Sequence, residues 1–78
     1  MKIERSEKFM EQYAAAPANV RAACDKQLAL LANNLRHPSL RAKRFLDTWQ
    51  ARVTRSWRMY FDIVGDTYHL TSIIAHPK

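Results

Sequence analysis

The apolar residues in the first half of the chain recur at a helical period. Five of them are spaced by four, four, three and four positions, which predicts an amphipathic helix packed on the core. These residues are Val20, Cys24, Leu28, Leu31 and Leu35. Because Cys24 lies within this stripe, we expect it to be a small buried hydrophobe rather than a nucleophile.

A shorter helix is expected before this one. Ser6 is a good N-cap, because its hydroxyl can accept from a free backbone N–H in the first turn. Phe9, Met10 and Tyr13 then fall on one face of the helix. Pro17 ends this helix and is suited to start the next one at its first position. The two helices are therefore expected to form a hairpin.

From residue 49 onwards the apolar period becomes two. Apolar and polar side chains alternate over residues 49–54 and again over 57–63, which predicts two strands with one buried face each. Gly65-Asp66 is a two-residue hairpin loop that leads into a third strand. On the apolar face this loop predicts the pairs Ile63 with Tyr68, Phe61 with Leu70, Met59 with Ser72, and Trp57 with Ile74.

The opposite face of these strands is polar. The same register places Asp62 beside His69, Tyr60 beside Thr71, and Arg58 beside Ile73. A three-residue turn near residues 55–56 would add Gln50, Arg52 and Thr54 to this face. Cations that hold phosphates and a ring that stacks on a base are typical of a surface for single-stranded nucleic acid. The alternative is a solvated face on which Asp62 and His69 merely form a cross-strand pair.

Composition predicts a single folded domain over residues 1–78. The chain is 47% hydrophobic and 26% charged, which is globular rather than disordered. One cysteine allows no intrachain disulfide and favours a reducing cytoplasm. The cysteine and three histidines have no metal-site spacing, and the apolar runs are too short for a signal peptide or a membrane span.

The net charge of +6 is concentrated in one segment. Six basic side chains and one acid, Asp47, lie within 18 residues, which leaves five net positive charges there. The basic residues are Arg41, Lys43, Arg44, Arg52, Arg55 and Arg58. Such a local excess suggests a surface for a polyanion or an acidic protein. A solvated basic face without a partner is the other interpretation.

Several segments, taken together, resemble the RelE/ParE superfamily, the toxins of bacterial type II toxin–antitoxin pairs. They are HPSLRAK at 37–43, WQARV at 49–53, WRMYF at 57–61, GDTY at 65–68 and IIAH at 73–76. The resemblance covers nearly the whole chain and implies that residues 2–5, too short to assign from pattern, add a strand to the sheet. The expected fold is therefore α+β and RelE-like, with a short N-terminal strand, a helical hairpin and a three-stranded antiparallel meander (β-α-α-β-β-β).

The RelE branch implies an endoribonuclease that cleaves messenger RNA on the ribosome without a metal or another cofactor. The ribose 2′-OH attacks the adjacent phosphate and leaves a 2′,3′-cyclic phosphate and a 5′-OH, which requires a base, an acid and cations. The resemblance implies that Arg52 and Arg58 clamp the phosphate and that His76 transfers a proton. The residues expected to contact RNA are Arg41, Lys43, Arg44, Arg55, Tyr60 and Lys78.

Strand alternation and the resemblance disagree about His76. In the register above, His76 falls on the core side with Leu70 and Ile74, so a twist, bulge or strand end is needed to bring it to Arg52. The sequence also departs from many RelE relatives. These relatives carry a C-terminal tyrosine or further basic residues beyond the position of Lys78. Some members also carry a lysine pair where this chain has Arg52 alone.

Two other functions are open on this evidence. One is a ParE-like toxin, which is not an enzyme and inhibits DNA gyrase. The other is an inactive member that only binds its antitoxin. All three interpretations place the protein in the bacterial cytoplasm, away from membranes, with an acidic and partly disordered antitoxin as its partner.

Overall fold

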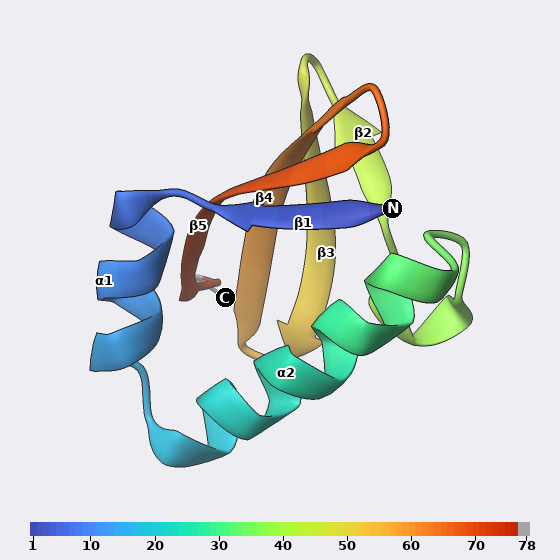
Figure 1. Cartoon of the computed structure of the whole chain (residues 1–78). Coiled ribbons are helices and arrows are strands. Elements are labelled where there is room, and N and C mark those ends of the chain that lie inside the picture. The colour runs from blue at the N-terminus through green and yellow to red at the C-terminus, as the bar shows by residue number, and fades with distance from the viewer. Residues whose placement is uncertain (77–78) are drawn as a thin grey trace.

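The computed structural model describes residues 1–76, in which two helices cover one side of a five-stranded sheet (Figure 1). The elements are β1 (Lys2–Arg5), α1 (Glu7–Ala15), α2 (Ala18–Asn33), the 3-10 helix η1 (Pro38–Leu40), β2 (Lys43–Phe45), β3 (Thr48–Thr54), β4 (Trp57–Val64) and β5 (Thr67–Ala75). The strand order is β1-β5-β4-β3-β2, with β1 parallel to β5 and the other neighbours antiparallel. The expected α+β class and the strand at residues 2–5 are confirmed. Strand β2 was not predicted, because three residues are too few to show an alternation.

The two helices diverge from a short connection at residues 16–17, and each covers a different strand. Ser6 caps α1 as expected, since its Oγ accepts from the backbone N–H of Phe9 at 3.0 Å. Pro17 is the N-cap of α2, one residue before the helical position that we expected. Helix α1 lies against β5 and α2 lies against β3. A hydrogen bond of 2.7 Å from the Tyr13 hydroxyl to Asp25 Oδ1 joins the two helices. Within residues 1–76, neither helix is long and apolar enough to cross a membrane.

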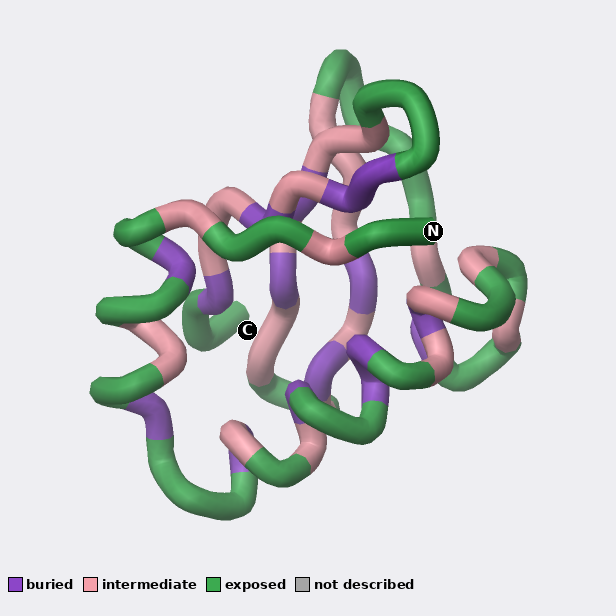
Figure 2. Tube along the Cα trace, viewed as in Figure 1, coloured by how far each residue is buried: buried purple, intermediate pink, exposed green. Residues whose placement is uncertain are grey.

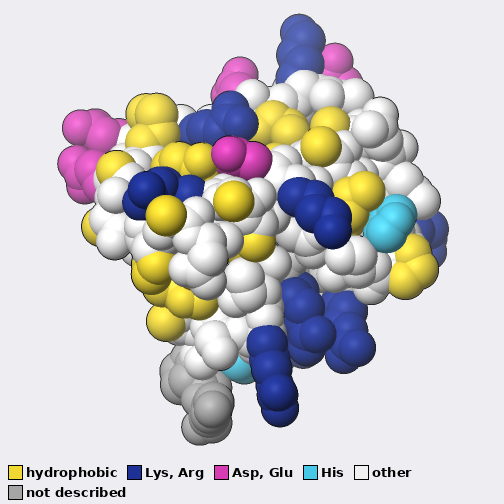
Figure 3. Space-filling view, turned by 90° about the horizontal axis from the view of Figure 1, so that it is seen from below, with side chains coloured by type: hydrophobic (Ala, Val, Ile, Leu, Met, Phe, Trp, Pro, Cys, Tyr) yellow, Lys and Arg dark blue, Asp and Glu magenta, His cyan; other side chains and the backbone are white. Residues whose placement is uncertain are grey.

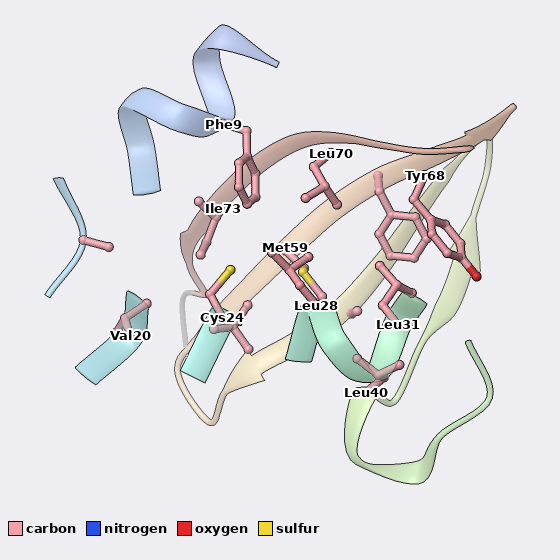
Figure 4. Close-up of a cluster of buried hydrophobic side chains, with 14 residues drawn as sticks. Phe9, Val20, Cys24, Leu28, Leu31, Leu40, Met59, Tyr68, Leu70 and Ile73 are labelled. Atoms are coloured by element: carbon pink, nitrogen blue, oxygen red, sulfur yellow. The ribbon is translucent and has the colours of Figure 1, made fainter. Parts of the chain in front are cut away.

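The core lies between the helices and the sheet (Figure 2). Figure 4 shows side chains of α2 and of the strands pointing toward one another there. The first four residues of the predicted stripe, Cys24 included, are buried. Leu35 is only half-buried, because α2 ends at Asn33. Met10 is 50% exposed, so Phe9 rather than Met10 anchors α1 to the core.

A bulge at Thr71 changes the register between β4 and β5. The predicted pairs of Ile63 and Phe61 are confirmed, but beyond them the partner of every β4 residue lies one position further along β5. The observed pairs are Tyr60 with Ser72, Met59 with Ile73, Arg58 with Ile74, and Trp57 with Ala75. The four partners predicted for these residues are therefore wrong. The shift turns Ile73 into the core and leaves Ile74 40% exposed.

Side chains of the first helix region hold this bulge in place. Strand β1 reaches only as far as Leu70, so the next part of the β5 edge faces α1. Ser6 Oγ donates to the Thr71 carbonyl at 3.2 Å, and the Ile73 N–H donates to Gln12 Oε1 at 3.0 Å. Thr71 Oγ1 itself donates to the Tyr60 carbonyl at 3.2 Å. Backbone groups at the irregular edge are thus paired by side chains, as buried polar groups require.

The turn between β3 and β4 also differs from the prediction. It has two residues, Arg55 and Ser56, because Thr54 pairs directly with Trp57. The extra residue lies instead within β3, where Val53 forms a bulge between the pairs made by Arg52 and Thr54. Gln50 and Arg52 therefore share a face with Tyr60 and Arg58, as expected from an odd loop. The placement of Thr54 on that face was wrong, because the bulge pairs Thr54 with Trp57.

Candidate nucleic-acid interface

The sheet face that points away from the helices, called the outer face below, carries two polar pairs between β3 and β4, in addition to the predicted pair of Asp62 with His69 between β4 and β5. Arg52 lies opposite Arg58, and Gln50 lies opposite Tyr60. Neighbouring residues on one face of a strand are about 6.8 Å apart along it. The structure therefore brings together the three predicted residues Arg52, Arg58 and Tyr60.

Arg52 is held in an environment that disfavours its charge. Its side chain is half-buried, and within residues 1–76 its buried Nε has no hydrogen-bond partner. Burial lowers the pKa of Arg52, and the positive charges of Arg41, Arg58 and Arg55 lower it further. A guanidinium with a free buried N–H among other cations is well suited to accept an anion such as a phosphate.

Arg58 is fixed by the turn that it follows. Its Nη1 donates to the carbonyls of Thr54 at 2.7 Å, Trp57 at 3.0 Å and Arg55 at 3.2 Å. Nε and Nη2 take no part in these bonds. Arg58 thus holds the β3–β4 turn and presents the rest of its guanidinium in a restricted orientation.

Four arginines, called the arginine cluster below, surround this part of the outer face: Arg41, Arg52, Arg55 and Arg58. Arg41 follows η1 in a left-handed conformation with φ 45°, and Arg55 lies in the β3–β4 turn. In the part of the chain that the structure describes, the one ion pair joins His69 Nδ1 to Glu4 Oε2 at 3.2 Å, outside the cluster. Figure 3 shows several Lys and Arg side chains close together at its lower edge, where no acidic side chain is visible, and others spread over the rest of this view. The cluster is therefore left without a counter-charge from the described residues.

A hollow of about 630 Å³, called the hairpin hollow below, opens beside the Gln50–Tyr60 pair. It is lined by Lys43, Phe45, Leu46, Asp47, Thr48, Gln50 and Tyr60. Lys43, which was predicted to contact RNA, lies opposite Gln50 and thus belongs to the outer face. Arg44 lies opposite Trp49, so alternation points it to the other face, and its Nε donates to the Leu46 carbonyl at 3.2 Å. The structure therefore does not bring Arg44 together with the other predicted residues.

Gln27, which the sequence reasoning missed, supports Arg52 from behind the sheet. Beyond Gln50 the edge of β3 has no strand partner from β2, and η1 and α2 lie there instead. Gln27 is 4% exposed, and its Nε2 donates to the carbonyls of Arg52 at 2.9 Å and Ser39 at 3.1 Å. Its Oε1 accepts from Ser39 Oγ at 3.2 Å. The available signal was a polar residue three positions after Cys24, on the buried side of α2.

The Thr71 bulge moves His76 from the core side to the side of the arginines. The His76 N–H donates to the Ser56 carbonyl at 2.6 Å and extends the pairing one residue past β5. In the shifted register, alternation groups His76 with exposed Ile74, which lies opposite Arg58. The prediction from simple alternation is therefore wrong, because it assumed no bulge. Lys78 lies outside the described residues.

Metal chemistry has no evident site in the described region. Among residues 1–76, no three His, Cys, Asp or Glu side chains are grouped so that they could hold a metal ion. His37 is used locally, since its Nδ1 accepts from the Ser39 N–H at 3.1 Å. The chemistry of the outer face is that of cations, an aromatic ring and, at its end, an imidazole.

Comparison with solved structures shows a shared fold. The YoeB/ParE toxin from Agrobacterium tumefaciens superposes with a TM-score of 0.82 at 12% identity, covering 99% of this chain and 100% of that one. The isolated E. coli RelE toxin gives 0.78 at 12% identity, with coverage of 99% and 85%. The RelB-RelE antitoxin–toxin complex from Methanococcus jannaschii gives 0.77 at 14%, with coverage of 91% and 87%. No sequence model of a known family and no curated protein matches the chain. The chain therefore has the fold of RelE/ParE-type toxins, as its sequence motifs suggested.

Proposed function

We propose that this protein is the toxin of a type II toxin–antitoxin pair and that it cleaves messenger RNA bound to the ribosome. The observation that carries the proposal is Arg52, whose buried Nε has no partner within residues 1–76 and which lies opposite Arg58. Around it the arginine cluster lacks an acidic partner among the described residues. A phosphate is the ligand that best satisfies both the free N–H and the excess charge. The shared fold with RelE supports the same conclusion.

The cleavage reaction needs only groups of this kind. The ribose 2′ oxygen forms a bond to phosphorus and loses its proton, while the bond from phosphorus to the 5′ oxygen breaks and that oxygen gains a proton. Arg52 and Arg58 stabilise the negative charge of the phosphorane between these two events. His76 supplies one of the two proton transfers, because an imidazole can both accept and donate a proton, and water supplies the other. The products are a 2′,3′-cyclic phosphate and a 5′-OH.

The partners follow from charge and from the neighbours. The net charge of +6 favours an acidic antitoxin that covers the arginine cluster until it is released. A solved complex of RelE with RelB has the same toxin fold, which supports an antitoxin of that kind. The target is then ribosome-bound messenger RNA in the bacterial cytoplasm.

A paired assay tests the proposal. Purified protein is incubated with translating ribosomes and a labelled transcript, and in parallel with DNA gyrase in a supercoiling reaction. We expect transcript cleavage and unchanged supercoiling. Arg52→Ala and Arg58→Ala should each slow cleavage about 10²–10³-fold, as loss of one transition-state donor does. Lys8→Ala, which removes one exposed charge from α1, should leave cleavage unchanged.

Because Arg58 also holds the turn, circular dichroism melts must show that the variant folds before its activity is interpreted. Inhibited gyrase with an intact transcript would replace the proposal with the ParE-like alternative. Neither activity, together with tight antitoxin binding, would favour an inactive member.

A further inference from the structure

The hairpin hollow has the size and lining of a site for a small planar ligand. Its volume of about 630 Å³ lies within the ~300–1,000 Å³ range of small-molecule sites. The ring of Tyr60 lines it on the β4 side, and the β2–β3 turn closes it on the other. Sites of this kind combine apolar walls with a few polar groups that fix the ligand's orientation.

Two apolar side chains form the outer part of this hollow and are exposed to solvent. Phe45 is 70% exposed and Leu46 is 82% exposed, so neither is buried in the core. Leu46 also has a φ of 56°, in the left-handed region that a leucine rarely adopts. The turn thus exposes two large apolar side chains to water, and its backbone at Leu46 has a conformation that glycine or asparagine would adopt more easily. A ligand with a flat apolar surface would cover them.

The polar groups of the hollow differ from those of the arginine cluster. Asp47 is the single acid within residues 41–58, and the one ion pair among the described residues does not include it. A carboxylate repels phosphate, but it accepts hydrogen bonds from the amino and imino groups of a nucleobase. Gln50 and Thr48 add an amide and a hydroxyl, and Lys43 supplies a cation for an adjacent phosphate.

The position of the hollow relates it to the proposed cleavage site. The Gln50–Tyr60 pair is the next outer-face pair after Arg52–Arg58, about 6.8 Å along the strands. That step is comparable to the reach of one nucleotide in an extended strand. A phosphate held by the two arginines therefore brings the base of a neighbouring nucleotide to Tyr60 and the hollow.

We propose that the hairpin hollow binds the base of the unpaired nucleotide next to the scissile phosphate and selects among bases through Asp47. The inference rests on the proposed function for its substrate, RNA. Guanine presents two adjacent donors to a carboxylate, adenine and cytosine present one amino group each, and uracil presents a single N–H between two carbonyls. The expected order of preference is guanine, then adenine or cytosine, then uracil. Tyr60 and Phe45 contribute stacking that is common to all four bases.

Binding of short oligonucleotides tests this site without any cleavage. Four trinucleotides that differ only in the central base, with 2′-deoxyribose so that they cannot be cut, are titrated into the full chain and followed by NMR. We expect the guanine form to bind about tenfold more tightly than the uracil form, which corresponds to about 1.4 kcal/mol. Asp47→Asn should bring this ratio close to one. Phe45→Ala should weaken all four oligonucleotides alike.

Asp62→Asn is the matched control, because Asp62 is an acid on β4 that pairs with His69 and does not line the hollow. It should leave the ratio unchanged. Equal binding of the four oligonucleotides by the unmodified protein, or a ratio that survives Asp47→Asn, would overturn the proposal.

Mapping of cleavage sites on ribosome-bound transcripts separates this inference from the proposed function. If transcripts are cut and Asp47→Asn does not change the base preference of the cuts, the proposed base site is wrong and the proposed ribonuclease activity stands. If no transcript is cut but the binding ratio appears and is lost in Asp47→Asn, the base site stands and the ribonuclease is wrong.

Discussion

Replacing Gln27 with leucine should slow RNA cleavage at the outer face more than the accompanying loss of stability explains. The change keeps the size of the side chain but removes its hydrogen bonds to the Arg52 carbonyl, the Ser39 carbonyl and Ser39 Oγ. Ser39 is exposed, so water can replace the bonds to its two groups. The main loss is the donor to the Arg52 carbonyl, and one unsatisfied buried group costs about 1–3 kcal/mol. We therefore expect Gln27→Leu to lower the free energy of unfolding by that amount.

The control is Leu31→Ala, one turn further along the same helix. Leu31 is 0% exposed and has no polar contact with β3, and its truncation should cost about 2–5 kcal/mol. Urea denaturation measures both losses, and transcript cleavage is then compared at a temperature where both variants are folded. Gln27→Leu should cut at least about tenfold more slowly than the unmodified protein, because displacement of a positioned group is costly. Leu31→Ala should be nearly as active as the unmodified protein. Equal activity of the two variants would refute a positioning role for Gln27.

Three further predictions concern the core, pH and proton transfer. Phe61→Ala should lower the free energy of unfolding, measured by urea denaturation, by about 3–5 kcal/mol, because Phe61 is 0% exposed and packs against Trp49 and Tyr68. A loss below about 1 kcal/mol, roughly the value of one buried methylene, would contradict the placement of Phe61 in the core. Burial raises the pKa of Cys24 from 9.0 to about 11. The contribution of the neutral thiol to the free energy of unfolding is therefore complete below pH 9 and is lost as the pH rises to 11. Melts between pH 9 and pH 11 should show that the free energy of unfolding falls by about 2–3 kcal/mol, and this fall should be absent in Cys24→Ala. The same pH dependence in Cys24→Ala as in the unmodified protein would argue against a buried thiol. His76→Ala and His76→Gln should both slow cleavage about 10²–10⁴-fold with unchanged RNA binding, whereas silent changes would exclude His76 from the chemistry.

The elements in which the apolar pattern repeats several times were predictable from the sequence. The stripe from Val20 to Leu31 and the alternation from Trp49 to Ile63 each repeat often enough to define a helix and two strands. The placement of Arg52 and Arg58 on one face was also predictable, although a bulge at Val53 produces it in place of a longer turn. Because apolar and polar residues alternate along both strands, packing the apolar residues into the core places the polar residues of both strands on the same outer face.

The residues that sequence could not place depend on contacts between distant segments. The bulge at Thr71 is held by Ser6 and Gln12, each more than sixty residues earlier in the chain than the group that it contacts. No local pattern near Thr71 reveals that α1 will pair its backbone groups. The position of His76 follows from that bulge and was unpredictable for the same reason. Gln27 is similar, since its partners Ser39 and Arg52 become neighbours only in the folded chain.

The chemical ends of the cleaved RNA test the central claim most directly. Ribosomes carrying a defined transcript are incubated with the protein in the presence of EDTA, and the new ends are identified by enzymatic ligation and mass spectrometry. We predict a 2′,3′-cyclic phosphate on one fragment and a 5′-OH on the other, formed equally fast in EDTA and about 10²–10³-fold more slowly with Arg52→Ala. Fragments with 5′-phosphate ends, a reaction stopped by EDTA, or full cleavage by folded Arg52→Ala would contradict the account.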